Sequence, residues 1–189
     1  MRKPWLVIAD LEADNSRLAK ESIIRQEAEA GNDEFFQGVR VALDSMITFG
    51  VKQVPEAVKD GRGLTYSAFW DTAKQLADRK ITGNAAQVAI VNLLNKATAQ
   101  EWNGWYRRIL IKDLRCGVSE STANKIWPAL IPEYPVMLAS GYDDKLVGQM
   151  IWPALVQLKL DGMRFNAIVQ SGKVEFKRSE EHTSELQSH

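Results

Sequence analysis

A short motif near the carboxyl end of the chain, K-x-D-G-x-R, combines a nucleophile with groups that suit a nucleotide. It comprises Lys159, Asp161, Gly162 and Arg164. A neutral lysine amine can attack phosphorus and form a phosphoramidate, but with a pKa near 10.4 only about one lysine in a few thousand is neutral at pH 7. A site that uses Lys159 in this way must lower its pKa by desolvation or by nearby positive charge, including bound metal.

The neighbours of Lys159 have simpler roles. Arg164 is always cationic and presents a fork of donors, which suits the ribose and phosphate side of a nucleotide. Asp161 and Gly162 are predicted to shape the turn that presents Lys159, because Asp-Gly is a common turn pair. The alternative reading is an ordinary β-hairpin in which Lys159 and Arg164 are solvated strand residues.

The motif and the chain before it resemble a known family. K-x-D-G-x-R is the signature of the covalent nucleotidyltransferases, a superfamily of DNA ligases, RNA ligases and mRNA capping enzymes. Five upstream blocks resemble, in order, the ATP-dependent DNA ligases of T-even bacteriophages. They are RKITGNAA from residue 79, KDLRCG from residue 112, ANKIWP from residue 123, LIP from residue 130 and MLAS from residue 137.

The resemblance implies an enzyme that uses ATP and Mg²⁺ to seal nicks in double-stranded DNA. Lys159 would take AMP from ATP, and Arg164 would contact the nucleotide. Magnesium offsets phosphate charge in such reactions, but no metal ligand is assigned within residues 1–177. The further motifs of the family are expected after residue 177, so the chain as written is expected not to seal DNA. A non-catalytic helical DNA-binding module, an RNA ligase and a capping enzyme are the alternatives.

The elements before the motif are predicted to be mainly α. Residues 15–127 read as successive helices, with breaks at 31–33, 61–63, 82–84 and 103–104, the last of which ends or interrupts a helix. Two buried faces are predicted from helical spacing. One comprises Ile90, Leu93, Leu94 and Ala97, and the other comprises Trp102, Tyr106, Ile109 and Leu110.

The candidates for DNA contact lie on these helices. Arg108, Lys112 and Arg115 fall within an arc of about 60° if the helix is regular, and phosphate contacts of this kind position a protein without reading sequence. Gly83 and Asn84 are second candidates, because N–H groups at a helix start bind phosphate. Lys125 is added only by the family resemblance. Solvated helix charges and a plain capped helix are the alternative readings.

The pattern changes after the last predicted helix. Trp127-Pro128 ends that helix, residues 131–150 are predicted to connect two domains, and strands are predicted over 156–160, 163–169 and 174–177. The expected fold class is a mainly α DNA-binding domain over 1–130, followed over 151–177 by the first antiparallel β-strands of an α+β nucleotidyltransferase domain.

Residues 178–189 are interpreted as foreign to the protein. They are polar, lack a period and resemble the translation of a DNA sequencing adapter; a native disordered tail is the alternative. Both histidines, His182 and His189, lie there, so no histidine catalysis or metal ligation is predicted. Without this segment 23 basic and 21 acidic residues remain, a net charge of +2.

The protein is expected to be cytoplasmic, in the host cell if it is viral, to act as a monomer and to have no membrane partner. No apolar run approaches the roughly 18 residues of a membrane span. The single cysteine, Cys116, cannot form an internal disulfide and is expected to be buried as a small apolar residue.

Overall fold

The computed structural model of the chain describes residues 1–51, 53–133, 143–151, 153, 165–170 and 172–178. The chain divides into two compact units, Met1–Pro132 and Glu133–His189. The motif around Lys159 lies outside the described residues, so the structure chiefly informs on the first unit.

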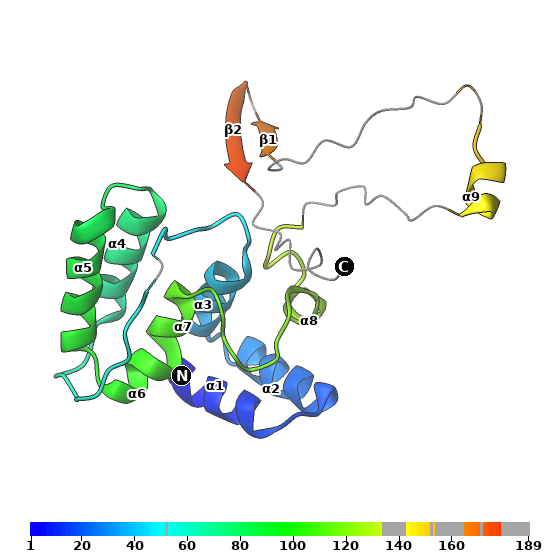
Figure 1. Ribbon diagram of the computed structural model, residues 1–189. Helices are drawn as coiled ribbons and strands as arrows, with labels where there is room; N and C mark the ends of the chain where they lie inside the picture. Colours follow the sequence, from blue (N-terminus) through cyan, green and yellow to red (C-terminus); the bar gives the residue numbers. More distant parts are fainter. Residues whose placement is uncertain (52, 134–142, 152, 154–164, 171, 179–189) are drawn as a thin grey trace, which may run out of the picture. The chain divides into compact units, whose positions relative to one another are not determined.

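The first unit is built of helices (Figure 1). The prediction that the chain is mainly α is thereby confirmed. The helical elements are α1 Pro4–Ala13, α2 Arg17–Glu29, α3 Asp33–Leu43, α4 Tyr66–Ala77, α5 Gly83–Lys96, α6 Ala99–Glu101, the π-helical turn η1 Trp102–Tyr106, α7 Arg107–Leu110 and α8 Glu120–Ile126.

Helix α1 begins earlier than the sequence pattern indicates. The predicted succession of helices starts at residue 15, whereas α1 starts at Pro4, where proline costs no helical hydrogen bond. Its buried residues include Val7, Ile8 and Leu11. The apolar run that contains the first two is too short to show a helical period, which explains why the helix was missed.

Side-chain caps set several of the other helix starts. The hydroxyl of Ser16 accepts from Ala19 N at the start of α2, and that of Ser119 accepts from Thr122 N at the start of α8. Thr98 and Glu101 form a reciprocal capping box at α6. Each cap satisfies N–H groups that lack partners within the helix.

The residues from α6 to α7 form one helical segment, 99–110, with a π-helical turn at its centre. The break predicted at 103–104 is thus an interruption, because Arg107 N bonds to Trp102 O five residues back. The predicted face of Trp102, Tyr106, Ile109 and Leu110 is confirmed, since none is more than 2% exposed.

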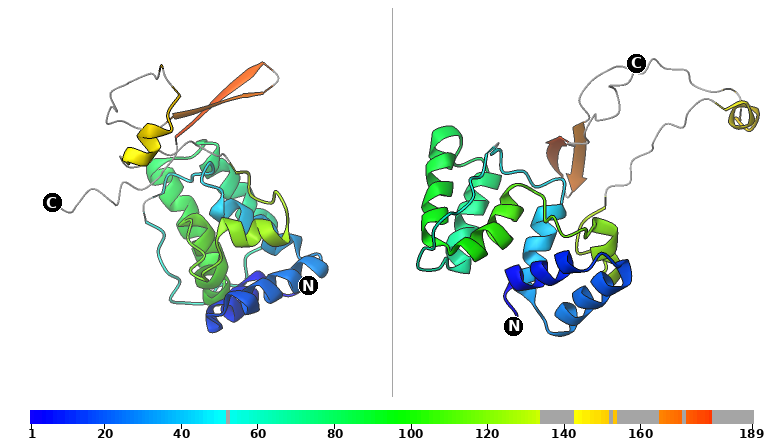
Figure 2. Two further views of the ribbon diagram at one scale, coloured as in Figure 1. Left: turned by 90° about the vertical axis from the view of Figure 1, so that its right-hand side faces the viewer. Right: turned by 60° about the horizontal axis from the view of Figure 1, so that its bottom comes forward.

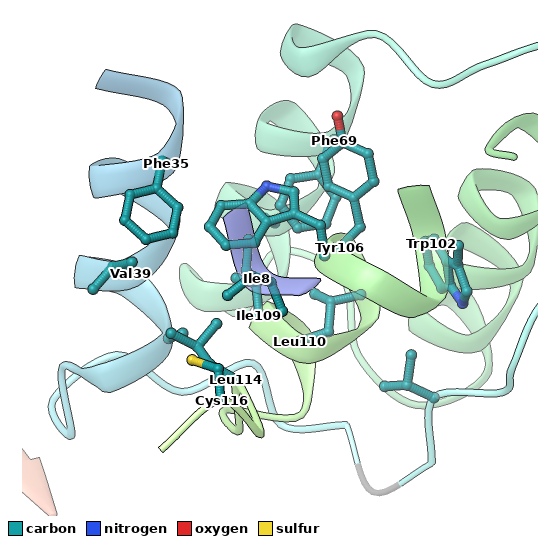
Figure 3. Close-up of a cluster of buried hydrophobic side chains, with 14 of the residues drawn as sticks. Ile8, Phe35, Val39, Phe69, Trp102, Tyr106, Ile109, Leu110, Leu114 and Cys116 are labelled. Atoms are coloured by element: carbon teal, nitrogen blue, oxygen red, sulfur yellow. The ribbon is translucent and has the colours of Figure 1, made fainter. Parts of the chain in front are cut away.

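The core of the first unit packs aromatic rings around this segment. Phe35 of α3 stacks on Trp105 with ring centroids 5.8 Å apart, and Phe69 of α4 meets Tyr106 at 4.4 Å. Figure 3 shows Phe35 and Val39 facing the 99–110 segment. Such ring pairs add to the free energy gained by burying their area. The segment therefore joins α3 and α4 into one core.

The connection between α3 and α4 contains no helix or strand among its described residues, yet it is held to the same segment by side chains. Asn103 exchanges two hydrogen bonds of 2.9 Å with the backbone of Ala57. Trp102 Nε1 donates to Pro55 O at 2.8 Å, and Arg107 Nε donates to Val54 O at 2.9 Å. These side-chain bonds satisfy backbone groups of residues 54–57, which form no helix or strand.

The predicted stripe on α5 is also confirmed. Ile90, Leu93 and Ala97 are no more than 4% exposed, and Leu94 is partly buried against the core. Helix α5 packs against α4, and Figure 1 shows the two side by side.

The second unit contains three described elements. Helix α9, Asp144–Gly148, lies within the predicted connection over 131–150 and is capped by Asp143, which accepts from Lys145 N at 2.7 Å. Strands β1, Phe165–Gln170, and β2, Lys173–Arg178, pair antiparallel with Val169 opposite Val174. The strand predicted over 156–160 lies outside the described residues, as does the supposed adapter segment after Arg178.

Among the described residues, no helix has the length and apolar character needed to cross a membrane.

Gly38 of α3 makes the close approach of Trp105 possible. A Cβ atom at this position would lie 2.1 Å from the indole ring. Gly38→Ala is therefore expected to lower the free energy of unfolding by about 1–3 kcal/mol through overpacking, although alanine normally favours a helix. Urea unfolding followed by circular dichroism measures the change. Gln26→Ala on the exposed face of α2 is the control, and an equally stable Gly38→Ala protein would contradict this packing.

Candidate nucleic-acid interface

The predicted basic stripe on a regular helix is wrong. Helix α7 ends at Leu110, and both Lys112 and Arg115 have positive φ angles, +61° and +54°. The π-helical turn before α7 also changes the angular positions that a regular helix would give. Arg108, Lys112 and Arg115 therefore do not share one helix face, and each has different partners.

Arg108 is folded into the first unit. Its side chain is 14% exposed and contacts Glu12 at 2.7 Å. Its Nη1 also donates to Leu114 O at 2.8 Å, and its Nε donates to Asn103 O at 3.1 Å. The guanidinium thus links α1 to the chain that follows α7, and little of it faces solvent.

Lys112 holds the end of another helix. Its ammonium group donates to Val41 O and Asp44 O, each at 2.5 Å, at the carboxyl end of α3. A cation there satisfies carbonyls that have no helical partner and interacts favourably with the helix dipole. Lys112 N and Asp113 N close α7 in a Schellman motif, in which glycine is the usual residue at the Lys112 position.

Arg115 is the most exposed of the three. Its side chain is 53% exposed and lies 3.5 Å from Asp113, which is itself 60% exposed. An ion pair this open to water contributes little stability. Of the three first candidates, only Arg115 presents most of its side chain to solvent.

A hollow of about 600 Å³ lies beside Arg115 on the first unit. Arg107 also lines it, and was missed because a regular helix places it outside the predicted arc. Its side chain is 16% exposed and lies 3.4 Å from Glu56. The lining residues are Gln53, Val54, Pro55, Gln87, Arg107, Ile111, Asp113 and Arg115.

The chemistry of this hollow suits a weakly held anion. Two guanidinium groups and two side-chain amides could donate hydrogen bonds to phosphate oxygens. Asp113 lines the same hollow and Glu56 pairs with Arg107, so the positive potential is reduced. The arrangement can position a phosphate but offers it no enclosed site.

Gly83 and Asn84 are both exposed at the start of α5. Thr82 precedes them in extended conformation and makes no side-chain cap, and Gly83 has a φ of +55°. Thr82 therefore does not cap the first N–H groups of α5, and a phosphate could bind them.

Lys125 is tied to a buried carboxylate. Its ammonium lies 2.6 Å from Glu21, whose side chain is 7% exposed and which also accepts from Arg17 at 3.0 Å. The hydrogen bond from Lys125 is the main cause that lowers the pKa of Glu21, and Arg17 lowers it further. Lys125 therefore joins α8 to α2.

Cys116 is 2% exposed, as predicted, and burial raises the pKa of its thiol. In the parts of the chain that the structure describes, no three His, Cys, Asp or Glu residues are grouped so that they could hold a metal ion. Lys159, Asp161, Gly162 and Arg164 lie outside these parts, so their roles stay predictions.

Comparison with known proteins gives a consistent result. No family model matches the chain. The DNA ligases of Enterobacteria phages T4 and T6 are each 45% identical to it over 101 residues, which is 53% of this chain. The chain resembles phage DNA ligase. It spans about a fifth of the length of these curated ligases, 20% of each.

Two solved structures extend the likeness of this ligase-like chain to nearly its whole length. The structure named "Pmar-Lig_Pre." is 42% identical with a TM-score of 0.75, over 95% of this chain and 42% of that chain. The structure named "Pmar-Lig_PreS3" is 43% identical with the same TM-score, over 95% of this chain and 43% of that chain.

Substitutions at Lys112 should separate two contributions to the stability of this chain: the hydrogen bonds of the Lys112 side chain and the strain of its backbone. Lys112→Ala is expected to lower the free energy of unfolding by about 1–3 kcal/mol, since charged hydrogen bonds are lost. Lys112→Gly should lose about 1 kcal/mol less, because glycine adopts a positive φ without strain. Arg115→Gly, with an equally positive φ but weak contacts, should be more stable than wild type. Urea unfolding measures all three, and equal losses for Ala and Gly at residue 112 would refute the strain.

The pKa of Glu21 predicts a pH dependence of stability. Its folded-state pKa lies below the ordinary value of 4.5, so its stabilising contribution is present above about that pH and is lost as the pH falls. Glu21→Gln is expected to unfold more easily than wild type at pH 7, and the difference should shrink towards pH 3. Thermal unfolding over this range measures it, with Glu29→Gln on the exposed end of α2 as control. A difference that stays constant with pH would contradict the ion pair.

Proposed function

We propose that the chain is the front part of an ATP-dependent DNA ligase. Its first unit would bind nicked double-stranded DNA, and Lys159 would carry AMP. The observation that carries the proposal is the 45% identity to phage DNA ligases over 101 residues. The motif of Lys159, Asp161, Gly162 and Arg164 supplies the matching chemistry.

In the proposed first step, Lys159 loses a proton and its amine attacks the α-phosphorus of ATP. A nitrogen–phosphorus bond forms, the bond to the β-phosphate oxygen breaks and pyrophosphate leaves. Arg164 is suited to hold the ribose and phosphate side of the nucleotide. Bound Mg²⁺ would offset the charge of the phosphates.

In the later proposed steps, AMP passes from Lys159 to the 5′-phosphate of a nick. The 3′-hydroxyl then attacks that 5′-phosphate, a phosphodiester bond forms and AMP leaves. Both steps require the helical unit to hold the two DNA ends in place, because correct orientation supplies much of the rate of such a reaction.

For the helical unit, we assign phosphate contact to the exposed candidates that have no buried partner, and structural roles to the others. Arg115, Gly83 and Asn84 face solvent, as phosphate contact requires. Arg108 and Lys112 hold α1, α3 and α7 in place through their internal bonds. Lys125 is assigned to the Glu21 ion pair, where it joins α2 to α8.

A chimaera tests the role of Lys159. Residues 1–177, which include Lys159, are joined to the part of phage T4 DNA ligase that follows the position aligned with residue 177. The chimaera is incubated with labelled ATP and Mg²⁺. The chimaera is expected to retain the label covalently, and Lys159→Ala should reduce it to background. Lys145→Ala, on the exposed helix α9, is the control and should label fully.

Two results would count against the proposal. A Lys159→Ala chimaera that labels as strongly as its parent would show that another residue is the nucleophile. A folded parent chimaera that binds nicked DNA but never acquires label would favour the non-catalytic DNA-binding module.

A further inference from the structure

We propose that one exposed row of helix α5 lies against the DNA duplex. The row consists of Asn84, Val88, Val91 and Asn95. The inference rests on the proposed function, and it locates the DNA on a surface that the predicted basic stripe does not include.

The four residues form a continuous row. They occupy positions i, i+4, i+7 and i+11, which fall within an arc of about 60° and span about 16 Å of a helix. Asn84 and Asn95 are exposed, Val88 is 60% exposed and Val91 is 42% exposed. The row therefore faces away from the core, which α5 contacts through Ile90 and Leu93.

The composition of this row is unusual for a solvated helix face. Residues 83–95 contain no Asp, Glu, Lys or Arg, although such residues make up 25% of the chain. The outer face of a surface helix normally carries charged side chains. Two valines and two amides in one exposed row are typical of a surface that meets a partner.

Cations stand at both ends of the row. Arg79, whose guanidinium donates to Thr48, and Lys80 precede α5, and Lys96 ends it. Arg62 lies beside Lys96, because Gly61 N and Gly63 N donate to Ala97 O and Lys96 O at 2.9 Å. An uncharged row between two basic ends matches a DNA groove, in which sugar and base edges lie between two rows of phosphates.

The balance of charge favours this part of the first unit. Residues 66–96, from the start of α4 to the end of α5, contain four basic residues against two acidic residues, Asp71 and Asp78. The rest of residues 1–132 contains fourteen basic against fourteen acidic residues. The positive excess of the first unit therefore lies on this pair of helices and the turn between them.

Three of the four cations here lack a carboxylate partner among the described residues, whereas several cations elsewhere on the first unit have one. Arg107, Arg108, Arg115 and Lys125 all pair with carboxylates. On α4, α5 and the turn between them, Lys80 lies 3.6 Å from Asp78, while Lys74, Arg79 and Lys96 make no ion pair within the described residues. Figure 1 and the right-hand view of Figure 2 both show α5 at an outer edge of the first unit, where a duplex can reach it.

The test measures binding of the 189-residue chain to a labelled nicked duplex by fluorescence anisotropy. Val88→Glu and Val91→Glu are each expected to weaken binding about tenfold or more, because a carboxylate is forced against phosphates. Val88→Thr keeps the shape without charge and should bind within about twofold of wild type. Gln26→Glu, on an exposed site of α2, adds the same charge elsewhere and should also bind as wild type.

Salt dependence gives a second, independent readout. Lys96→Gln should reduce the slope of log affinity against log salt by about one unit, as expected for the loss of one phosphate contact. Arg25→Gln, which removes an exposed cation from α2, should leave the slope unchanged. Circular dichroism and urea midpoints establish that each variant is folded.

The outcomes separate this inference from the proposed function. If wild type binds nicked DNA and the glutamate variants bind equally well, the α5 row does not contact DNA and the inference is overturned. If folded wild type does not bind nicked DNA, the proposed function of the helical unit fails first. If the glutamate variants instead change only self-association, measured by sedimentation, the row is an interface between copies of the chain and the inference also falls.

Discussion

The first unit depends on one constraint, which is that residues 54–57 have no backbone ladder and must be satisfied by the helical segment beside them. Trp102, Asn103 and Arg107 supply those hydrogen bonds. Trp105 and Tyr106 of the same segment pack against α3 and α4. The same segment thus organises both the core and the connection.

Two basic residues of this unit combine an unusual backbone conformation with side-chain contacts inside the unit. Arg79 and Lys112 each follow a helix in a Schellman motif with positive φ, at a position where glycine avoids a cost of about 1–2 kcal/mol. Both side chains reach the chain that follows α3: Arg79 donates to Thr48, and Lys112 caps α3 itself. At Lys112, the two hydrogen bonds of the side chain to Val41 O and Asp44 O offset the backbone strain.

We propose that the helical unit binds DNA and that Lys159 carries AMP, because charge and nucleophile lie in different parts of the chain. The helices α4 and α5 and the turn between them hold the positive excess, while the lysine motif follows the helical unit in sequence. A surface that binds DNA without reading its bases needs cations beside the phosphates and uncharged side chains between them. It needs no catalytic group of its own. The likeness to phage DNA ligases extends over 101 residues.

The sequence by itself determined the mainly helical class, the buried faces of α5 and of the 99–110 segment, and the end of α8 at Ile126, because these depend on local periodicity and on proline. It also contained the lysine motif, whose roles stay predictions. Only the tertiary structure showed that Arg108, Lys112 and Arg115 do not form a basic stripe. Arg108 and Lys112 bond to groups 96 and 68–71 residues away in the chain. A helical angle calculated from spacing carries no information about such distant partners, and it fails where a π-helical turn or a helix end intervenes. Burial of α1 was likewise decided by packing, since its short apolar run has no period of its own.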